Sequence, residues 1–134
     1  MSSPNFLAIY NIAPVLPGHS MVIPKKHISG IMDLTEEELT EMVSFSRDVV
    51  KLLLKVFKAD SFDWTIQEGK PAGQTIDHLH LHIIPRTEGD LPEPGDWYPK
   101  LERSESKNID SADRKRISKE QMKEIMRKLK GTQE

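Results

Sequence analysis

The sequence predicts an α+β fold: an antiparallel sheet of about five strands, one long helix on one face of it, and a further helix at the C-terminal end. Two patterns predict this fold. Segments 61–68 and 77–85 alternate apolar and polar residues, which is typical of half-buried strands. Segment 35–58 instead repeats its apolar residues at helical spacing. Because both strand segments carry one apolar row, we expect the long helix to cover the apolar face of the sheet.

Two short segments near the N-terminus predict the first hairpin. Segment 6–11 is apolar and rich in strand-forming residues, and segment 19–24 has the same character and ends at Pro24. The intervening segment, 11–18, contains two prolines and a glycine, which exclude a regular element. We therefore expect a rigid loop between two antiparallel strands.

The long helix has a clear beginning and a wide apolar surface. Thr35 and Glu38 form a capping-box pattern, and glutamates fill the first turn, where the helix dipole favours negative charge. From there to about Lys58, polar residues cover only about a third of the circumference. Packing on one sheet does not use that much apolar surface, so a second contact is expected. A homodimer interface and the C-terminal helix account for it equally well.

The chain changes in character after the last predicted strand, which defines the domain organisation. Residues 1–101 form the domain that carries the candidate site, and residues 102–117, with few apolar side chains, are predicted to be a charged flexible loop. Ser118 and Gln121 form a second capping box, so residues 118–134 are predicted to be a C-terminal helix packed on or near the same domain. Gly131 is the expected stop of that helix.

Composition excludes several classes of protein. The 134-residue chain has no cysteine, which excludes a disulfide framework and a thiolate metal site. No apolar run approaches ~18 residues and no secretory signal is evident, so we expect a cytoplasmic protein with no membrane contact, to which the nucleus is also accessible. Residues 1–99 hold 8 basic and 14 acidic side chains, whereas residues 100–134 hold 11 and 7. The acidic main body disfavours a nucleic-acid partner.

Three of the five histidines lie in one strand-like segment. His78, His80 and His82 alternate with apolar residues, so a strand would place the three imidazoles in a row on one face. Gln67 has the parity to share this histidine face if the preceding strand pairs with this one. With the long helix on the apolar side, we expect the histidine face to stay open for a ligand.

Three interpretations of the histidine row are available. Neutral imidazoles bind zinc, but same-face residues of a strand lie ~6.6 Å apart, so three consecutive ones do not reach one tetrahedral ion without distortion. A purely structural polar row remains open. Nucleophilic attack on phosphorus is favoured, because a neutral imidazole nitrogen is a good nucleophile near pH 7. His80, in the middle of the row, is then the natural nucleophile, with Gln67 and Thr75 as neutral polar groups beside it.

Several motifs resemble those of one known family. The segment His78-Leu-His80-Leu-His82-Ile-Ile resembles the histidine-triad (HIT) signature. Further matching motifs follow in order along the chain: Asn11-x-Ala-Pro-Val-x-Pro-Gly-His19, Val22-Ile-Pro-Lys25, Gln67-Glu-Gly69, Ala72-Gly-Gln-Thr75 and Pro85-Arg86. Over about residues 5–100 they resemble the fragile-histidine-triad branch, the dinucleoside polyphosphate hydrolases. The resemblance implies a HIT-like fold.

The resemblance also implies roles for individual residues. His80 attacks phosphorus, His78 holds and polarises His80 through hydrogen bonding, and His82 contacts phosphate together with Gln67. His19 supports the triad from behind. The implied substrate contacts are Asn11 at the sugar, Ile9 and Met21 at the base, and Gln74 and Thr75 at phosphate.

The activity that the resemblance implies is hydrolysis of a dinucleoside polyphosphate, such as diadenosine triphosphate. The products are a mononucleotide and the remaining nucleotide, formed through a nucleotidyl-histidine. Two alternatives stay open: a nucleoside phosphoramidase of the same superfamily, and a nucleotide-binding signalling module with little turnover. The family works as homodimers, which favours the dimer explanation of the wide helix. We expect no protein-bound metal; a divalent cation, Mg²⁺ or Mn²⁺, would arrive with the substrate.

Overall fold

A computed structural model describes residues 1–106 and 116–133 of the chain. Its sheet has four antiparallel strands in the order β1-β2-β4-β3, one fewer than the five or so that the sequence predicts. In the described residues, Ser2 makes only an isolated bridge to Leu7 and adds no further strand. The strands are β1 (Phe6–Tyr10), β2 (Ser20–Pro24), β3 (Ser61–Ile66) and β4 (Leu81–Arg86), and the helices are α1 (Glu36–Phe57), α2 (Trp97–Ser106) and α3 (Lys119–Gln133).

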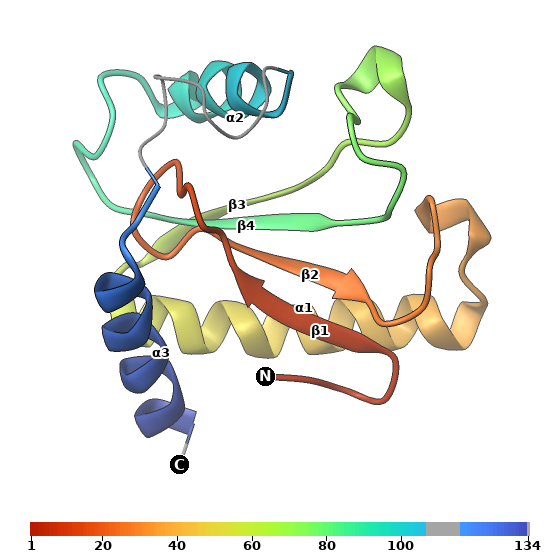
Figure 1. The fold of residues 1–134 in the computed structure, drawn as a ribbon, viewed down its shortest axis with the longest axis horizontal. Helices are drawn as coiled ribbons and strands as arrows, with labels where there is room; N and C mark the ends of the chain where they lie inside the picture. The colour runs from red at the N-terminus through yellow and green to blue at the C-terminus, as the bar shows by residue number, and fades with distance from the viewer. Residues whose placement is uncertain (107–115, 134) are drawn as a thin grey trace.

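Two helices cover opposite faces of this sheet (Figure 1). α1 runs along one face, and α2 lies over the other. The register of the strands shows which residues share the second face: Ile9 pairs with Met21, Met21 with His82, and His82 with Thr65. Directly paired residues point to the same side of a sheet. The face under α2 is therefore the histidine face.

α1 forms where the sequence predicts it. The backbone N–H of Glu38 donates to Thr35 Oγ1 (3.1 Å), and the backbone N–H of Thr35 donates to Glu38 Oε1 (2.9 Å), which completes the capping box. The helix ends after Phe57, where Lys58 adopts a left-handed φ of 54°. Its buried side packs on the apolar face of the sheet, as predicted. This core includes Phe6, Val22, Met42, Phe45, Val49, Val50, Leu53, Leu81 and Ile83.

α3 covers one side of α1. Ser118 and Gln121 exchange capping hydrogen bonds of 2.8 and 3.1 Å, as the sequence predicts, but the helix continues through Gly131 instead of stopping there. Leu129 belongs to the core cluster and Ile125 packs against it, so α3 accounts for part of the wide apolar surface of α1. In the part of the chain that the structure describes, no helix is both long and apolar enough to cross a membrane.

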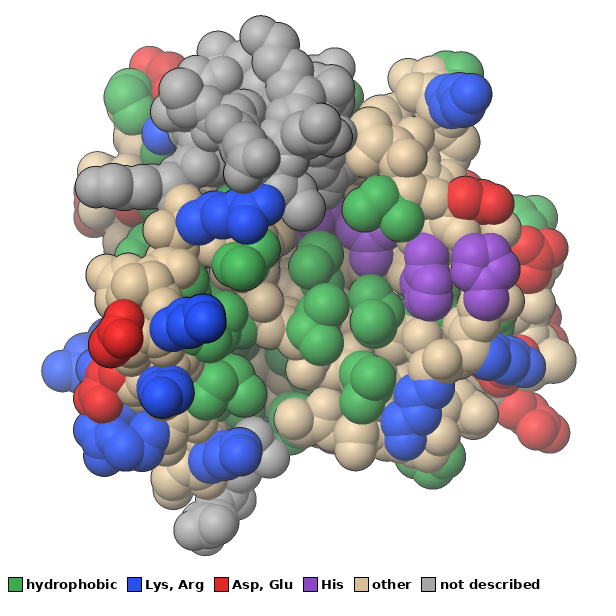
Figure 2. All heavy atoms as spheres, in the orientation of Figure 1, with side chains coloured by type: hydrophobic (Ala, Val, Ile, Leu, Met, Phe, Trp, Pro, Cys, Tyr) green, Lys and Arg blue, Asp and Glu red, His purple; other side chains and the backbone are tan. Residues whose placement is uncertain are grey.

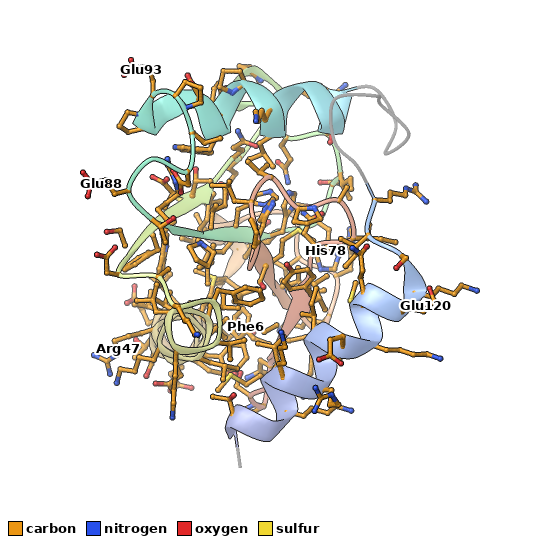
Figure 3. The ribbon with its side chains drawn as sticks, turned by 90° about the vertical axis from the view of Figure 1, so that its left-hand side faces the viewer. Phe6, Arg47, His78, Glu88, Glu93 and Glu120 are labelled. Carbon is orange, nitrogen blue, oxygen red and sulfur yellow. The ribbon has the colours of Figure 1, made fainter. Side chains whose placement is uncertain are left out.

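α2 departs from the sequence prediction. A flexible loop is predicted from residue 102 onward, whereas Trp97–Ser106 is helical; residues 107–115 lie outside the described residues. The cause is tertiary, because Leu101 is completely buried. In the view turned by 90°, α2 again lies on the side of the sheet opposite α1 (Figure 3). The histidine face is thus covered by a helix, where the sequence analysis expects it to be open.

The loop between β1 and β2 is fixed against the end of β4. Gly18 has a φ of 95°, and a Cβ atom there would lie 2.7 Å from the Pro85 side chain, so only glycine fits. The backbone N–H of Gly18 also donates to the Tyr10 hydroxyl (2.8 Å). This close approach brings the next residue, His19, beside the histidine strand.

Candidate active site

The histidine segment enters the sheet later than its alternation predicts. The backbone N–H of Leu79 bonds to the carbonyl oxygen of Ile28 (2.6 Å), outside the sheet, and β4 begins only at Leu81. His82 therefore lies in the strand, and His80 precedes it. Their rings still meet edge to face, with centroids 4.8 Å apart.

His78 does not join this pair in a continuous row. Its Nε2 lies 3.2 Å from the carbonyl oxygen of Pro24, and its ring meets that of His27 with centroids 5.4 Å apart. Figure 2 shows histidine side chains both at the surface and deeper between apolar neighbours. His27 is exposed and His78 partly so, whereas His80 and His82 are buried. The expected row of three imidazoles is a buried pair and a separate histidine near the surface.

Hydrogen bonding fixes which nitrogen of His80 is reactive. Its Nδ1 lies 2.9 Å from the carbonyl oxygen of His78. A carbonyl oxygen only accepts, so Nδ1 carries the hydrogen and the neutral ring keeps its lone pair on Nε2. The side chain is only 9% exposed. The contact that His78 makes here comes from its backbone carbonyl.

A second series of hydrogen bonds orients His82. The backbone N–H of Val15 donates to His19 Nδ1 (3.1 Å), and His19 Nε2 lies 2.9 Å from His82 Nδ1. Because Val15 makes Nδ1 of His19 an acceptor, a neutral His19 carries its hydrogen on Nε2 and donates it to His82. A neutral His82 then holds its own hydrogen on Nε2. Both rings are completely buried, which shields this order of donors from water.

Gln67 brings a buried amide to the same face. Thr65 pairs with His82, and the register continued by two residues would set Gln67 opposite His80. Gln67 is 6% exposed, and neither its Nε2 nor its Oε1 has a hydrogen-bond partner among the described residues. An unpaired buried amide costs about 1–3 kcal/mol. The Gln67 amide is therefore a candidate hydrogen-bonding partner for a bound ligand.

The residues implied for the nucleoside lie on the other side of His82. Met21 pairs with His82 and Ile9 pairs with Met21, so both apolar side chains extend the histidine face across β2 to β1. Asn11 is buried; its Oδ1 accepts from the backbone N–H of Ala13 (2.8 Å), and its Nδ2 lies 4.0 Å from the Met21 sulfur. The structure thus brings an amide and an apolar surface together beside the imidazoles.

The loop after β3 holds the remaining two predicted residues, and it uses them differently. Gln74 Oε1 accepts from the backbone N–H of Gly69 (2.7 Å), and Gln74 Nε2 donates to the carbonyl oxygen of Ser29 (3.0 Å). Both ends of this amide therefore hold the loop that follows Gln67. Thr75 is exposed.

Arg86 belongs to the Pro85-Arg86 motif, and the sequence predicts no role for its side chain. Its guanidinium bonds to Asp63 and Asp90, and this contact lowers the pKa of Asp90 to about 2. The sequence contains a signal for this ion pair. Asp63 lies in the segment predicted to be the neighbouring strand, and Asp90 lies in the predicted loop that follows Arg86. The backbone donor of Val15 carries no comparable sequence signal.

This geometry supports nucleophilic chemistry at an electrophile that needs neutral hydrogen-bond donors. The lone pair of His80 Nε2, the hydrogen on His82 Nε2 and the amide of Gln67 belong to one buried face. Fixed donors of this kind stabilise developing negative charge without reorganising. Within the described ranges, no three histidine, aspartate or glutamate side chains are grouped so that they could hold a metal ion.

Several known proteins are similar to this chain in sequence. The HIT domain family matches residues 1–89. The asymmetrical bis(5'-nucleosyl)-tetraphosphatase of Schizosaccharomyces pombe is 43% identical over 98 residues, which cover 73% of this chain and 54% of that protein. The bis(5'-adenosyl)-triphosphatase of Dictyostelium discoideum is 38% identical over 96 residues, which cover 72% of this chain and 64% of that protein.

A solved structure extends the likeness to almost the whole chain. The crystal structure of a hypothetical histidine triad nucleotide-binding protein from Sulfolobus tokodaii has a TM-score of 0.77 and 30% identity, covering 98% of this chain and 80% of that one. The matched region spans 54% and 64% of the two curated relatives above. The family match, the identity to these relatives and the shared architecture agree with one another, and the chain belongs to the HIT domain family.

Proposed function

We propose that the protein hydrolyses dinucleoside polyphosphates, such as diadenosine triphosphate, through a nucleotidyl-histidine at His80. The observation that carries this proposal is the hydrogen bond that His80 Nδ1 donates to the carbonyl oxygen of His78. This hydrogen bond leaves Nε2 of His80 as the nucleophilic atom. The names of the two curated relatives support the substrate class.

The reaction proceeds in two displacements at phosphorus. His80 Nε2 attacks the α-phosphorus, a P–N bond forms, and the P–O bond to the departing nucleotide breaks with its electron pair on oxygen. The Nδ1 hydrogen bond stabilises the positive charge that develops on the ring. Water then attacks the same phosphorus, the P–N bond breaks, and His80 recovers its lone pair while the mononucleotide leaves. One proton is released from the attacking water.

Other residues of the site bind the substrate around this atom. His82 and Gln67 donate to oxygens of the α-phosphate, where charge develops during both displacements. Asn11 binds the ribose, and Ile9 and Met21 contact the base. Thr75 contacts the leaving phosphates, and Gln74 contributes by holding its loop. Mg²⁺ or Mn²⁺ enters as part of the substrate complex.

The protein acts in the cytoplasm as a homodimer. The support for a dimer is an uncovered apolar groove of about 390 Å³ on α1, lined by Leu39, Thr40, Val43, Ser44 and Arg47. Val43 is 49% exposed. β3 is an edge strand whose Phe62 and Trp64 are also exposed, and such edges are usually paired or covered.

Turnover of diadenosine triphosphate by the full-length protein and by His80→Ala tests the activity. We expect the wild-type protein to release AMP and ADP, and an acid quench to trap AMP on the peptide that contains His80. Equal turnover by the two proteins would contradict the assignment of the nucleophile. A higher kcat/KM on a nucleoside phosphoramidate would indicate a phosphoramidase, and tight dinucleotide binding with negligible turnover a signalling module.

A further inference from the structure

α2 and the sheet enclose a second, smaller apolar layer on the histidine face. Ile84 shares this face of β4 with His82, and both Ile84 and Leu101 of α2 are 0% exposed. Leu91, in the connection between β4 and α2, is also buried. None of the three belongs to the core cluster beneath α1. Figures 1 and 3 agree that α2 lies on the side of the sheet opposite α1.

The Arg86 side chain connects the segments that position α2 above the sheet. The Arg86 guanidinium donates to Asp63 Oδ2 on β3 (2.7 Å) and to both carboxylate oxygens of Asp90 (2.8 Å each). It also donates to the carbonyl oxygen of Pro94 (2.6 Å), three residues before α2 begins. Arg86, the last residue of β4, thus joins this strand to β3 and to two residues, Asp90 and Pro94, of the connection that leads into α2.

The hydrogen bonds from Arg86 to the two carboxylates are charge-assisted, and such bonds are stronger than those between neutral groups. The Arg86 and Asp90 side chains are each only 12% exposed, so water screens their ion pair little. The two parallel bonds to Asp90 give a fixed orientation that a single charge would not give. Asp90 Oδ2 also accepts from the backbone N–H of Thr87 (3.0 Å), which closes the turn after β4. The connection into α2 is therefore held to the sheet by polar bonds, with Leu91 and Leu101 buried at its sides.

We infer that Arg86 is a positioning residue: it fixes α2 over the histidine face and thereby limits the access of water to His80 Nε2. Its effect on catalysis rests on the proposed function, because water exclusion strengthens the fixed donors around the reacting phosphate. Its effect on the access of solvent to His80 does not depend on any activity.

Chemical modification measures that access directly. The full-length protein is treated briefly with diethyl pyrocarbonate, which acylates the unprotonated nitrogen of neutral imidazoles, and each histidine peptide is quantified by mass spectrometry. For Arg86→Gln we expect His80 to react about tenfold faster than in the wild type, which corresponds to losing one charge-assisted contact. His27, which is exposed, should react at an unchanged rate and serves as the internal standard.

Two further variants distinguish an effect on the position of α2 from a general loss of stability. Arg86→Lys keeps the positive charge but loses the planar guanidinium that donates two parallel hydrogen bonds. It should therefore give an intermediate rate of His80 modification. Lys51→Gln, which changes an exposed lysine on α1 outside the groove proposed as the dimer interface, should give the wild-type rate. Hydrogen exchange should accelerate in peptides from α2 and stay slow in α1 and β4. If Arg86→Gln does not fold, Asp90→Asn, which keeps the contact to Asp63, provides the same comparison.

The kinetic consequence is a selective loss. For Arg86→Gln we expect kcat to fall about tenfold with KM nearly unchanged, because the lost feature acts on the reacting centre more than on binding. An unchanged modification rate at His80, with or without faster exchange in α2, would overturn the inference. Failure of the wild type to hydrolyse any dinucleotide would overturn the proposed function and leave the modification result intact.

Discussion

The two faces of the sheet are covered by helices that are held in different ways. α1 covers its face with a continuous apolar core that includes Phe45, Val49 and Leu53. α2 covers the histidine face through a thin apolar layer and the polar bonds of Arg86. Substitutions beneath α1 should therefore change mainly stability, whereas substitutions beneath α2 should change mainly activity. The His80 ring contacts His82 on the histidine face, whereas the next residue, Leu81, belongs to the core beneath α1, so the comparison can be made within a single segment.

The largest expected effect is on the histidine face. His80→Ala should lower kcat/KM on diadenosine triphosphate by at least about 10³-fold, because the substitution removes the proposed nucleophile. The midpoint of thermal unfolding should change by only a few degrees, since the side chain is not part of the core under α1. Single-turnover kinetics and calorimetry of the same preparation would measure both quantities. His27→Ala is the matched control and should keep full activity.

The next residue should behave in the opposite way. Leu81 is completely buried in the core beneath α1, so Leu81→Ala should lower the free energy of unfolding by about 2–5 kcal/mol. Turnover per folded molecule should stay close to that of the wild type. Urea unfolding followed by fluorescence, together with active-site titration, would separate the two. A loss of turnover per folded molecule as deep as that of His80→Ala would remove the distinction between the faces.

The support behind His82 should have an intermediate effect. His19→Ala removes the donor to His82 Nδ1 and frees that ring to change tautomer, so kcat should fall about 10²-fold, the usual loss for one oriented donor. His19→Gln offers an amide N–H in a similar place and should restore part of the rate. If the two variants were equally slow, the relay from Val15 would not be what orients His82.

Local patterns in the sequence predict the α1 side well and the α2 side poorly. The capping box at Thr35 and the apolar face of α1 depend on residues a few positions apart, and both are confirmed. His78 leaves the predicted row because of a bond between Leu79 and Ile28, which are distant in sequence. α2 has few apolar residues, and burial of Leu101 and the contacts of Arg86 stabilise it.

The same reason applies to the individual site residues. Parity along the strands places Gln67 with the histidines, and Ile9 and Met21 with Asn11 and His19. The register then shows that Ile9 and Met21 share the histidine face with His82, and its continuation beyond β3 sets Gln67 there as well. Gln74 is a polar loop residue, and its sequence context does not distinguish a ligand contact from the backbone contacts that it makes to Gly69 and Ser29. Side-chain amides in loops satisfy either partner equally well.

The face of α1 that points away from the sheet carries the groove proposed as the dimer interface. Val43→Glu places a charge in the apolar groove of α1 and should weaken a homodimer by about 30-fold or more, the effect of losing a central interface contact. Light scattering coupled to gel filtration across a dilution series would measure the change. Lys55→Glu, on an exposed position of the same helix, is the control. A wild-type protein that is monomeric at all concentrations would contradict the dimer.

The smallest expected effect is the pH dependence of the ion pair that anchors α2. Arg86 lowers the pKa of Asp90 from 3.8 to about 2. Because the folded-state pKa is the lower one, the unfolded chain takes up the proton first as the pH falls. The contribution of Asp90 is therefore complete above about pH 4 and is lost as the pH falls from there through about 2, and it amounts to no more than about 2.5 kcal/mol.

Other carboxylates titrate in the same range, so the prediction concerns a difference between two proteins. The free energy of unfolding should fall more steeply between pH 4 and pH 2 for the wild type than for Asp90→Asn, and the two curves should converge at the acidic end. Urea unfolding at half-unit pH intervals measures this. Hydrogen exchange in α2 should accelerate over the same interval, ahead of exchange in α1, because this pair holds the connection that leads into α2. Parallel curves for the two proteins would show that Asp90 contributes no more to holding α2 than a neutral amide does.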